Sequence, residues 1–348
     1  MKKAFYTLLA SAALPCAAHA QSDVTLYGLM DTSLRYSTHE DASGRGKSYV
    51  SEGVLTGSRW GLRGTEALGA GMKAEFVLES GFSPDTGISQ QSGRLFGRQA
   101  FVGLSGNFGK VTLGRQFTLP QDVIGSYEPT YLGNLVLLGY QGTTYTGLRQ
   151  DNMVKYVGEF GGTQVMGSYT FGETPGSLKT GSSYATALGQ TMGPFKVAGV
   201  FQIQNDVANY FGSTVVPGRQ TTWSVGGTYT SGATTFYLGY TNSDLVVADY
   251  KNQALYTGAK VAFGPSWSLL TTFTIDKLKH ADQDGRRVST GAVLGYALSK
   301  RTDVYVAADY TWLKDAWMTV AQTPGFFTPF YAGYNTRIGT MAGVRHRF

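Results

Sequence analysis

Cysteine is almost absent from this chain, and the one cysteine, Cys16, lies close to the N-terminus. If that segment is removed on export, the remaining protein has no thiol and forms no disulfide. Histidine occurs four times, at spacings that do not resemble a zinc site. No G-x-S-x-G nucleophile elbow is present either. We therefore predict no metal site, no cofactor and no catalytic residues, and expect that the protein is not an enzyme.

Charged side chains and long apolar runs are also scarce. Charged residues make up 15% of the sequence, whereas soluble domains carry about a quarter. After residue 20 no apolar run is long enough for a membrane-spanning helix, and the mean hydropathy is −0.13. Glycine, at 47 residues, and aromatic residues, at 13%, are abundant. This composition suits strands with one face toward lipid and one toward water, because alternation hides apolar residues from a hydropathy window.

The N-terminus has the pattern of a secretory signal peptide. Two lysines precede an apolar run over 4–14, and Ala18-His19-Ala20 supplies the small-x-small cleavage pattern. We predict a signal peptide over 1–20 and a mature β-barrel domain over 21–348. A lipoprotein signal ending at Cys16 is an alternative, but the proline before the cysteine fits it poorly.

Strict alternation identifies the first clear strand. Across 73–79 the charged side chains of Lys73, Glu75 and Glu79 fall on one face, and the intervening positions 74, 76 and 78 are apolar. In a β-sandwich the apolar face would be core, and in a membrane barrel it would face lipid. The local pattern leaves both possibilities open.

The number of such segments favours a barrel. About sixteen recur without a convincing helical interruption, an even number within the range of outer-membrane barrels. They lie at roughly 24–37, 57–66, 71–82, 93–105, 109–118, 150–160, 162–172, 181–192, 194–205, 219–230, 232–243, 251–263, 265–279, 286–298, 301–314 and 334–348. We predict an all-β fold, a transmembrane antiparallel β-barrel of about 16 strands.

The connections between these segments alternate in length. Tight turns are expected at 67–70, 106–108, 161–162, 193–194, 231–232, 264–265 and 299–300. Longer polar loops are expected at 38–56, 83–92, 173–180, 206–218, 244–250, 280–285 and 315–333. Short turns at one end and long loops at the other are typical of bacterial outer-membrane barrels. The last strand ends at Phe348, and if its ring faces lipid, Arg345 and Arg347 face the lumen.

Several segments resemble the general porins of β-proteobacteria. They are Val24-Thr25-Leu26-Tyr27-Gly28, Ser58-Arg59-Trp60-Gly61-Leu62-Arg63-Gly64, Leu78-Glu79-Ser80-Gly81-Phe82, the stretch 94–104, Val111-Thr112-Leu113-Gly114-Arg115-Gln116 and the ending Gly343-Val344-Arg345-His346-Arg347-Phe348. The resemblance implies a homotrimer of sixteen-stranded barrels in the outer membrane, reached through the periplasm. It also implies an inward-folded constriction loop, here 118–148, and recognition of Phe348 by the barrel assembly machinery. Outer-membrane lipid and lipopolysaccharide are expected partners.

The same resemblance places the pore constriction on charged residues. The basic wall falls on Arg59, Arg98 and Arg149, and Arg94 shares a face with Arg98 if 93–105 is a strand. Glu79, Asp122 and Glu128 are expected to oppose the arginines. Arg115 is a misfit, because alternation aims it outward unless Gly114 hosts a bulge.

The charge balance and the strand pattern favour one function among several. Residues 21–348 carry 27 basic and 23 acidic side chains, a surplus of four. Rings of arginine favour anions, so we predict a passive, weakly anion-selective channel for small hydrophilic solutes. The arginines are scattered through strands, which argues against binding of nucleic acid.

Three alternatives stay open at this stage. A specific channel for sugars or phosphate-like anions could use an aromatic slide formed by Tyr127, Tyr131, Tyr140 and Tyr145. A surface adhesin could bind a partner through the loop 315–333. A barrel enzyme would need a Ser/His pair at one rim, and nothing in the sequence nominates one.

Overall fold

The computed structural model describes residues 23–52, 55–130, 147–206, 218–321 and 333–348. The predicted signal peptide, 1–20, lies outside these residues and stays a prediction. No helix in these ranges is long and apolar enough to cross a membrane. Apart from the two lysines of the signal segment and Glu52, every charged side chain of the chain is described.

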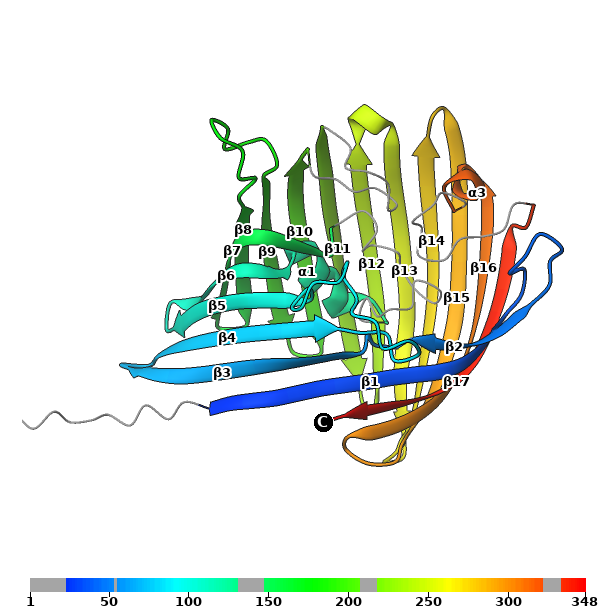
Figure 1. Cartoon of the computed structure of the whole chain (residues 1–348), viewed down its shortest axis with the longest axis horizontal. Coiled ribbons are helices and arrows are strands. Elements are labelled where there is room, and N and C mark those ends of the chain that lie inside the picture. Colours follow the sequence, from blue (N-terminus) through cyan, green and yellow to red (C-terminus); the bar gives the residue numbers. More distant parts are fainter. Residues whose placement is uncertain (1–22, 53–54, 131–146, 207–217, 322–332) are drawn as a thin grey trace, which may run out of the picture.

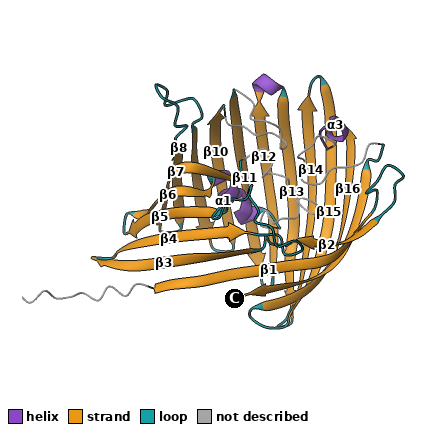
Figure 2. Ribbon diagram, viewed as in Figure 1, coloured by secondary structure: helices purple, strands orange, loops and turns teal. Residues whose placement is uncertain are grey.

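Strands dominate the described part of the chain, and neighbouring strands pair antiparallel in sequence order (Figures 1 and 2). They are β1 Asp23–Ser37, β2 Lys47–Glu52, β3 Arg59–Gly69, β4 Met72–Gly81, β5 Gln99–Gly106, β6 Gly109–Phe117, β7 Arg149–Phe160, β8 Thr163–Thr170, β9 Ser183–Met192, β10 Phe195–Asn205, β11 Arg219–Ser231, β12 Thr234–Leu245, β13 Tyr250–Phe263, β14 Trp267–His280, β15 Gln283–Ala297, β16 Thr302–Asp315 and β17 Thr336–Arg347.

The sheet closes on itself through β1. One edge of β1 pairs with β17, from Leu29 opposite Arg347 to Ser37 opposite Gly339. The other edge pairs with β3 in its first half and with β2 in its second half. Because β2 and β3 together fill one position in the wall, the 17 described strands form a closed barrel of sixteen strand positions. The predicted fold class is confirmed.

Two predicted connections differ from the structure. The short strand β2 lies inside the predicted loop 38–56, because β1 extends far enough beyond β3 to offer it a free edge. The predicted loop 280–285 is instead a two-residue turn at Ala281 and Asp282. Both residues have positive φ, at 49° and 62°, as in a type I′ hairpin, so β14 and β15 run to full length.

Alternation along the strands separates an apolar outer face from a polar inner face. In β11, Trp223 and Val225 are 39% and 53% exposed, whereas Thr222 and Ser224, which alternate with them, are buried. A wall built in this way satisfies its backbone groups internally and presents apolar side chains to lipid. Exposed apolar residues therefore mark the membrane-facing surface of the barrel.

The loop after β6 begins with a helix inside the barrel. Helix α1, Leu119–Tyr127, starts at Thr118, whose side chain accepts a hydrogen bond from the backbone N–H of Gln121. Its buried side chains, Leu119 and Ile124 among them, pack against inward residues of β8–β13 and so form an apolar core inside the lumen. The first half of the predicted constriction loop is thus inward-folded, and residues 131–146 lie outside the described ranges.

Two shorter helical segments lie at the loop end of the barrel. The 3-10 helix η2 spans Val246–Ala248, and helix α3 spans Ala316–Ala321 (Figure 1). Trp317 of α3 is fully buried, and its indole N–H donates to the carbonyl oxygen of Asp276 at 3.0 Å. The start of the predicted loop 315–333 therefore packs against the barrel wall, and 322–332 lies outside the described residues.

Candidate functional site

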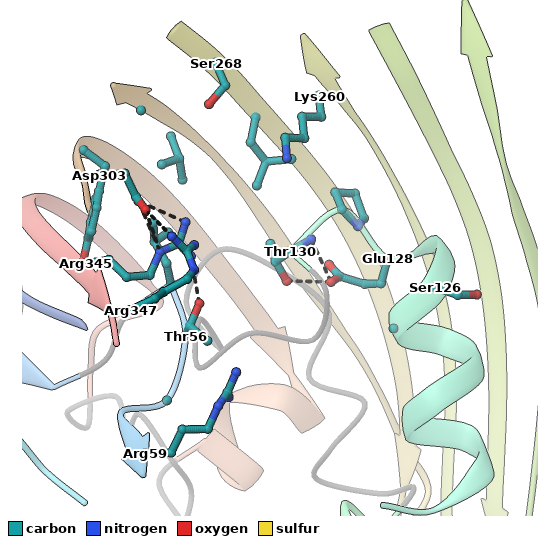
Figure 3. A pocket seen from close by; sticks show the side chains of 18 of the residues that line it. Thr56, Arg59, Ser126, Glu128, Thr130, Lys260, Ser268, Asp303, Arg345 and Arg347 are labelled. Atoms are coloured by element: carbon teal, nitrogen blue, oxygen red, sulfur yellow. Dashed lines mark hydrogen bonds and ion pairs between the residues drawn. The ribbon is translucent and has the colours of Figure 1, made fainter. Parts of the chain in front are cut away.

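A cavity of about 950 Å³ opens between α1 and the inner faces of β3, β4 and β13–β17 (Figure 3). Ten charged side chains line it within the described residues. The cationic ones are Arg59, Arg98, Arg149, Lys260, Arg345 and Arg347, and the anionic ones are Glu79, Asp122, Glu128 and Asp303. Six of the seven residues predicted for the constriction are in this set, and Arg94 is not.

Glu79 lies between two arginines. Arg98 Nε donates to Glu79 Oε1 at 2.8 Å, and Arg59 Nε lies 3.5 Å from Glu79 Oε2. The hydroxyl of Tyr27 donates to Oε2 at 3.1 Å. Glu79 was expected to oppose the arginines from across the pore, but it lies beside them and holds them in place. The wall keeps one net positive charge here, because two guanidinium groups share one carboxylate.

Arg149 begins β7 and has no carboxylate partner within the described residues. Its guanidinium lies 4.5 Å from the centre of the Phe117 ring, an arrangement that orients the charge by a cation–π contact. Its Nε is buried and makes no hydrogen bond to the described part of the chain. Among the lining arginines, Arg149 is thus the one whose charge is least neutralised locally.

The C-terminal strand supplies a second basic cluster (Figure 3). Arg345 Nη2 and Arg347 Nη1 contact the two oxygens of Asp303 at 3.0 and 2.8 Å. Arg345 also donates to Thr56 Oγ1 at 2.9 Å. As at Glu79, two arginines share one carboxylate. The expectation that Arg345 and Arg347 face the lumen agrees with their place on the cavity wall.

Helix α1 brings acidic side chains to the facing wall. Glu128 follows the helix, and its Oε2 accepts hydrogen bonds from Thr130 N–H at 2.8 Å and Thr130 hydroxyl at 2.6 Å. Asp122 pairs with Lys155 at 2.8 Å. Desolvation raises the pKa of Asp122 above its ordinary value, and the Lys155 ammonium acts in the opposite direction. Figure 3 shows Glu128 on the α1 side of the cavity and Arg59, Arg345 and Arg347 on the other side.

The position of α1 is fixed by a buried tyrosine. The Tyr127 hydroxyl donates to Ser224 Oγ at 2.8 Å, and its ring stacks against Tyr256. Burial raises the pKa of Tyr127 to about 12, so the phenol stays neutral. Tyr127 is 1% exposed and cannot present its ring to a passing solute. Of the other members of the suggested aromatic slide, Tyr131, Tyr140 and Tyr145 lie outside the described residues.

Arg94 and Arg115 form a separate cluster on Asp151. Arg94 Nη1 contacts both Asp151 oxygens, at 2.9 and 2.8 Å, and Arg115 Nη1 contacts one at 2.6 Å. The predicted strand 93–105 begins only at Gln99, so Arg94 and Arg98 do not share a strand face. Gln91, Ser92 and Gly93 all have positive φ and turn the chain before the strand starts.

The irregularity suspected at Gly114 is present, but the additional residue is on the neighbouring strand. From Gly114 to Gln116 the β6 chain advances two residues, while β7 advances three, from Met153 to Gln150. The bulge brings Asp151 within reach of Arg115, which also donates to the carbonyl oxygen of Gly97 at 2.7 Å. Arg115 is therefore paired and does not line the cavity.

Two charged lining residues were not predicted from the sequence. Lys260 is exposed on the inner face of β13, and Asp303 lies near the start of β16. Both follow the alternation of their strands, so the inward parity of β13 and β16 was a signal that could have found them. That they line the same cavity as the predicted constriction residues depends on barrel tilt and stagger, which no single strand encodes.

Phe348 ends the chain against β1. Its backbone N–H donates to Gly28 O, and its carbonyl accepts from Gly28 N–H, both at 3.1 Å. Its ring lies over Gly28, where an added Cβ would come within 2.2 Å of the ring. The missing side chain at position 28 therefore makes room for the terminal aromatic residue on the outer face.

A closed sixteen-position barrel with a helix folded inward and a charged cavity beside it defines a channel of the porin class. Comparison with known proteins agrees: the profile of the Gram-negative porin family matches residues 7–316, and the chain belongs to this family. It is 30% identical over the full length of both chains to outer membrane porin protein 32 of Delftia acidovorans. It is 29% identical, also over both full lengths, to an outer membrane porin protein of Bordetella pertussis.

Solved structures show the same barrel. An anion-selective porin from Comamonas acidovorans superimposes with a TM-score of 0.78 at 27% identity, over 94% of this chain and 100% of that one. OmpT of Vibrio cholerae has a TM-score of 0.68 at 19% identity, over 95% of this chain and 100% of that one, and shares the fold. The chain is therefore an outer-membrane porin of Gram-negative type, and its predicted place in the bacterial outer membrane is confirmed.

Proposed function

We propose that this porin is a general, weakly anion-selective diffusion channel for small hydrophilic solutes. The observation that carries the proposal is the charge of the cavity wall, where six cationic and four anionic side chains leave a surplus of two positive charges. Residues 53–54, 131–146, 207–217 and 322–332 contain no charged side chain. The balance is that of the described side chains, which do not include the side chain of Glu52.

The arrangement of the charges supports the sign of the selectivity. Each arginine pair shares one carboxylate, at Glu79 and at Asp303, so each pair keeps one positive charge. In a narrow passage with walls of low dielectric constant, fixed charges are screened less than in bulk water. Anions would be concentrated near the arginine walls, and Glu128 on the α1 side would set a field across the passage.

Relatives support this proposal from a second direction. The solved structure at 27% identity is described as an anion-selective porin. We further propose that this chain forms a homotrimer and that Phe348 is the assembly signal read by the barrel assembly machinery, as the family resemblance implies. Conductance steps in groups of three, recorded from purified protein, would support the trimer, and single uncorrelated steps would contradict it.

The selectivity proposal is tested at the C-terminal cluster, where positive charge can be removed from the wall and then partly restored. Arg345→Gln with Arg347→Gln takes two positive charges from the wall and leaves Asp303 unpaired. Bilayer recording in a salt gradient should then show loss of the anion preference. Adding Asp303→Asn removes one negative charge from the wall and should restore part of the anion preference.

Two controls belong with this series. Lys179→Gln removes a positive charge from an exposed loop outside the cavity and should leave selectivity unchanged. Heat-modifiable mobility on gels checks that each variant is folded. Unchanged selectivity in a folded Arg345→Gln/Arg347→Gln protein would remove this cluster from the selectivity filter.

A further inference from the structure

A short segment between β2 and β3, residues 55–58, enters the lumen beside the cavity. Three of its four residues line the cavity: Leu55, Thr56 and Gly57. Figure 3 shows Thr56 beside Arg345, on the side of the cavity away from α1. The segment is far in sequence from the predicted constriction loop 118–148, so a separate set of contacts holds it in place.

Ser58 closes a gap in the hydrogen bonding of β1. The strand pairs with β3 up to Leu29 and with β2 from Thr32 onward, so Asp31 lies between the two partners. The Ser58 hydroxyl accepts a hydrogen bond from Asp31 N–H at 3.0 Å and donates to the carbonyl oxygen of Asp31 at 3.2 Å. This hydroxyl supplies the hydrogen bonds that a neighbouring strand would give, and it fixes the point where the segment joins the wall.

The side chain of Asp31 holds the next part of the segment. Asp31 is fully buried, and its Oδ2 accepts a hydrogen bond from the backbone N–H of Thr56 at 2.7 Å. Its Oδ1 accepts from the hydroxyl of Tyr305 on β16, also at 2.7 Å. Because each oxygen has a donor, the carboxylate is held in one orientation and fixes the backbone at Thr56. The Thr56 hydroxyl accepts from Arg345 at 2.9 Å, which joins the segment to the C-terminal basic cluster.

Leu55 covers an apolar patch on the inner wall. The patch lies on the inner faces of β15–β17 and consists of Val293, Tyr305, Ala307 and Met341, against which Leu55 packs. Because the interior of a water-filled barrel is polar, an apolar patch there indicates where an inward element docks. Helix α1 docks in the same way on the other wall, where its apolar side chains pack against β8–β13.

We propose that residues 55–58 form a second constriction element, which narrows the channel from the wall opposite α1, and that Asp31 is its positioning residue. A diffusing solute passes between Thr56 on one side and α1 on the other. The two inward elements together set the largest solute that the channel admits. This inference rests on the channel function of the protein and not on the sign of its ion selectivity.

The first experiment tests whether Thr56 lines the passage. Residues 21–348 contain no cysteine, so a single introduced thiol can be modified selectively. Purified, folded Thr56→Cys porin should react with a bulky neutral methanethiosulfonate, and its single-channel conductance in a planar bilayer should then fall to a lower stable level. Ser43→Cys, in the exposed turn between β1 and β2, is the matched control and should keep its conductance. Unchanged conductance in fully modified Thr56→Cys protein would overturn the lining role.

The second experiment separates the hydrogen bonds of Asp31 from its charge. Asp31→Asn keeps an oxygen for Thr56 N–H and offers an amide group to the Tyr305 hydroxyl, so the exclusion limit for polyethylene glycols should stay at the wild-type value. Asp31→Ala removes both contacts, so larger polymers should enter the pore and the open-channel conductance should rise. Leu55→Ser removes the apolar anchor without changing a wall strand and should shift the limit in the same direction.

Heat-modifiable mobility on gels checks that each variant is folded, and Leu55→Ser carries the test if Asp31→Ala does not fold. Wild-type exclusion limits in the folded variants Asp31→Ala and Leu55→Ser would overturn the proposal. A limit that shifts as far in Asp31→Asn as in Asp31→Ala would reject Asp31 as the positioning residue. Since polyethylene glycols are uncharged, these results are independent of the proposed anion preference.

Discussion

Replacing Arg149 by glutamine tests the charge account most cleanly among single substitutions. Arg149 lines the cavity, stacks on Phe117 and has no carboxylate partner in the described part of the chain. Removing Arg149 leaves no buried carboxylate without a partner. Removing Arg59 or Arg98 would instead leave Glu79 with fewer hydrogen-bond donors. The surplus of positive charge on the wall would fall from two to one.

The size of the effect follows from Coulomb's law. An ion passing about 5 Å from a unit charge in water has an interaction energy of roughly 0.8 kcal/mol. At about 0.1 M salt, a Debye length of about 10 Å reduces this to roughly 0.5 kcal/mol. Anions lose this energy and cations gain it, so the anion-to-cation permeability ratio should fall by a factor of roughly two to five.

The assay is the zero-current potential of purified protein in a planar bilayer under a salt gradient. Arg149→Lys keeps the charge and should stay close to the wild-type value, while Lys179→Gln controls for charge outside the cavity. A folded Arg149→Gln channel with the wild-type potential would refute the assignment of Arg149 to the selectivity filter.

Three further substitutions test other parts of the structure. Glu79→Gln should raise the anion preference, because its two arginine neighbours lose their shared counter-charge; a shift toward cations in the same recording would contradict this. Asp309→Ala leaves the fully buried guanidinium of Arg35 without its carboxylate partner and should lower the unfolding free energy by about 3–5 kcal/mol in urea titrations. Arg35→Met with Asp309→Leu removes both charges and should lower it by less. Gly28→Val should displace the Phe348 ring and lower the yield of folded barrel on gels, and an unchanged yield would show that this packing is dispensable.

Much of the barrel was predictable because each strand carries its own two-residue period. The alternation over 73–79 falls within β4, and the glycine-marked turns separate strands close to the predicted residues. Period two is a local property of a strand with one wet face, so it can be read from sequence without knowing the neighbours. The closed fold then follows from the even count and the need to leave no edge in lipid.

What the sequence did not reveal depends on partners far away in the chain. β2 exists because β1 leaves an edge open beside it. Arg94 does not line the cavity because the chain turns over 91–93 before β5 begins, and its guanidinium pairs with Asp151 of β7. Glu79 was expected to oppose Arg59 and Arg98 but lies beside them. The position of a residue in a strand shows which face its side chain is on, but not which side chains of other strands lie next to it. Lys260 was missed because its height in the barrel depends on stagger.

The most direct test of the central claim is the zero-current potential of the wild-type channel in a salt gradient. The wall has two positive charges in excess, so chloride should cross more readily than potassium and the dilute side should become negative. A dilute side that becomes positive would mean that the arginine walls do not control the passage of ions.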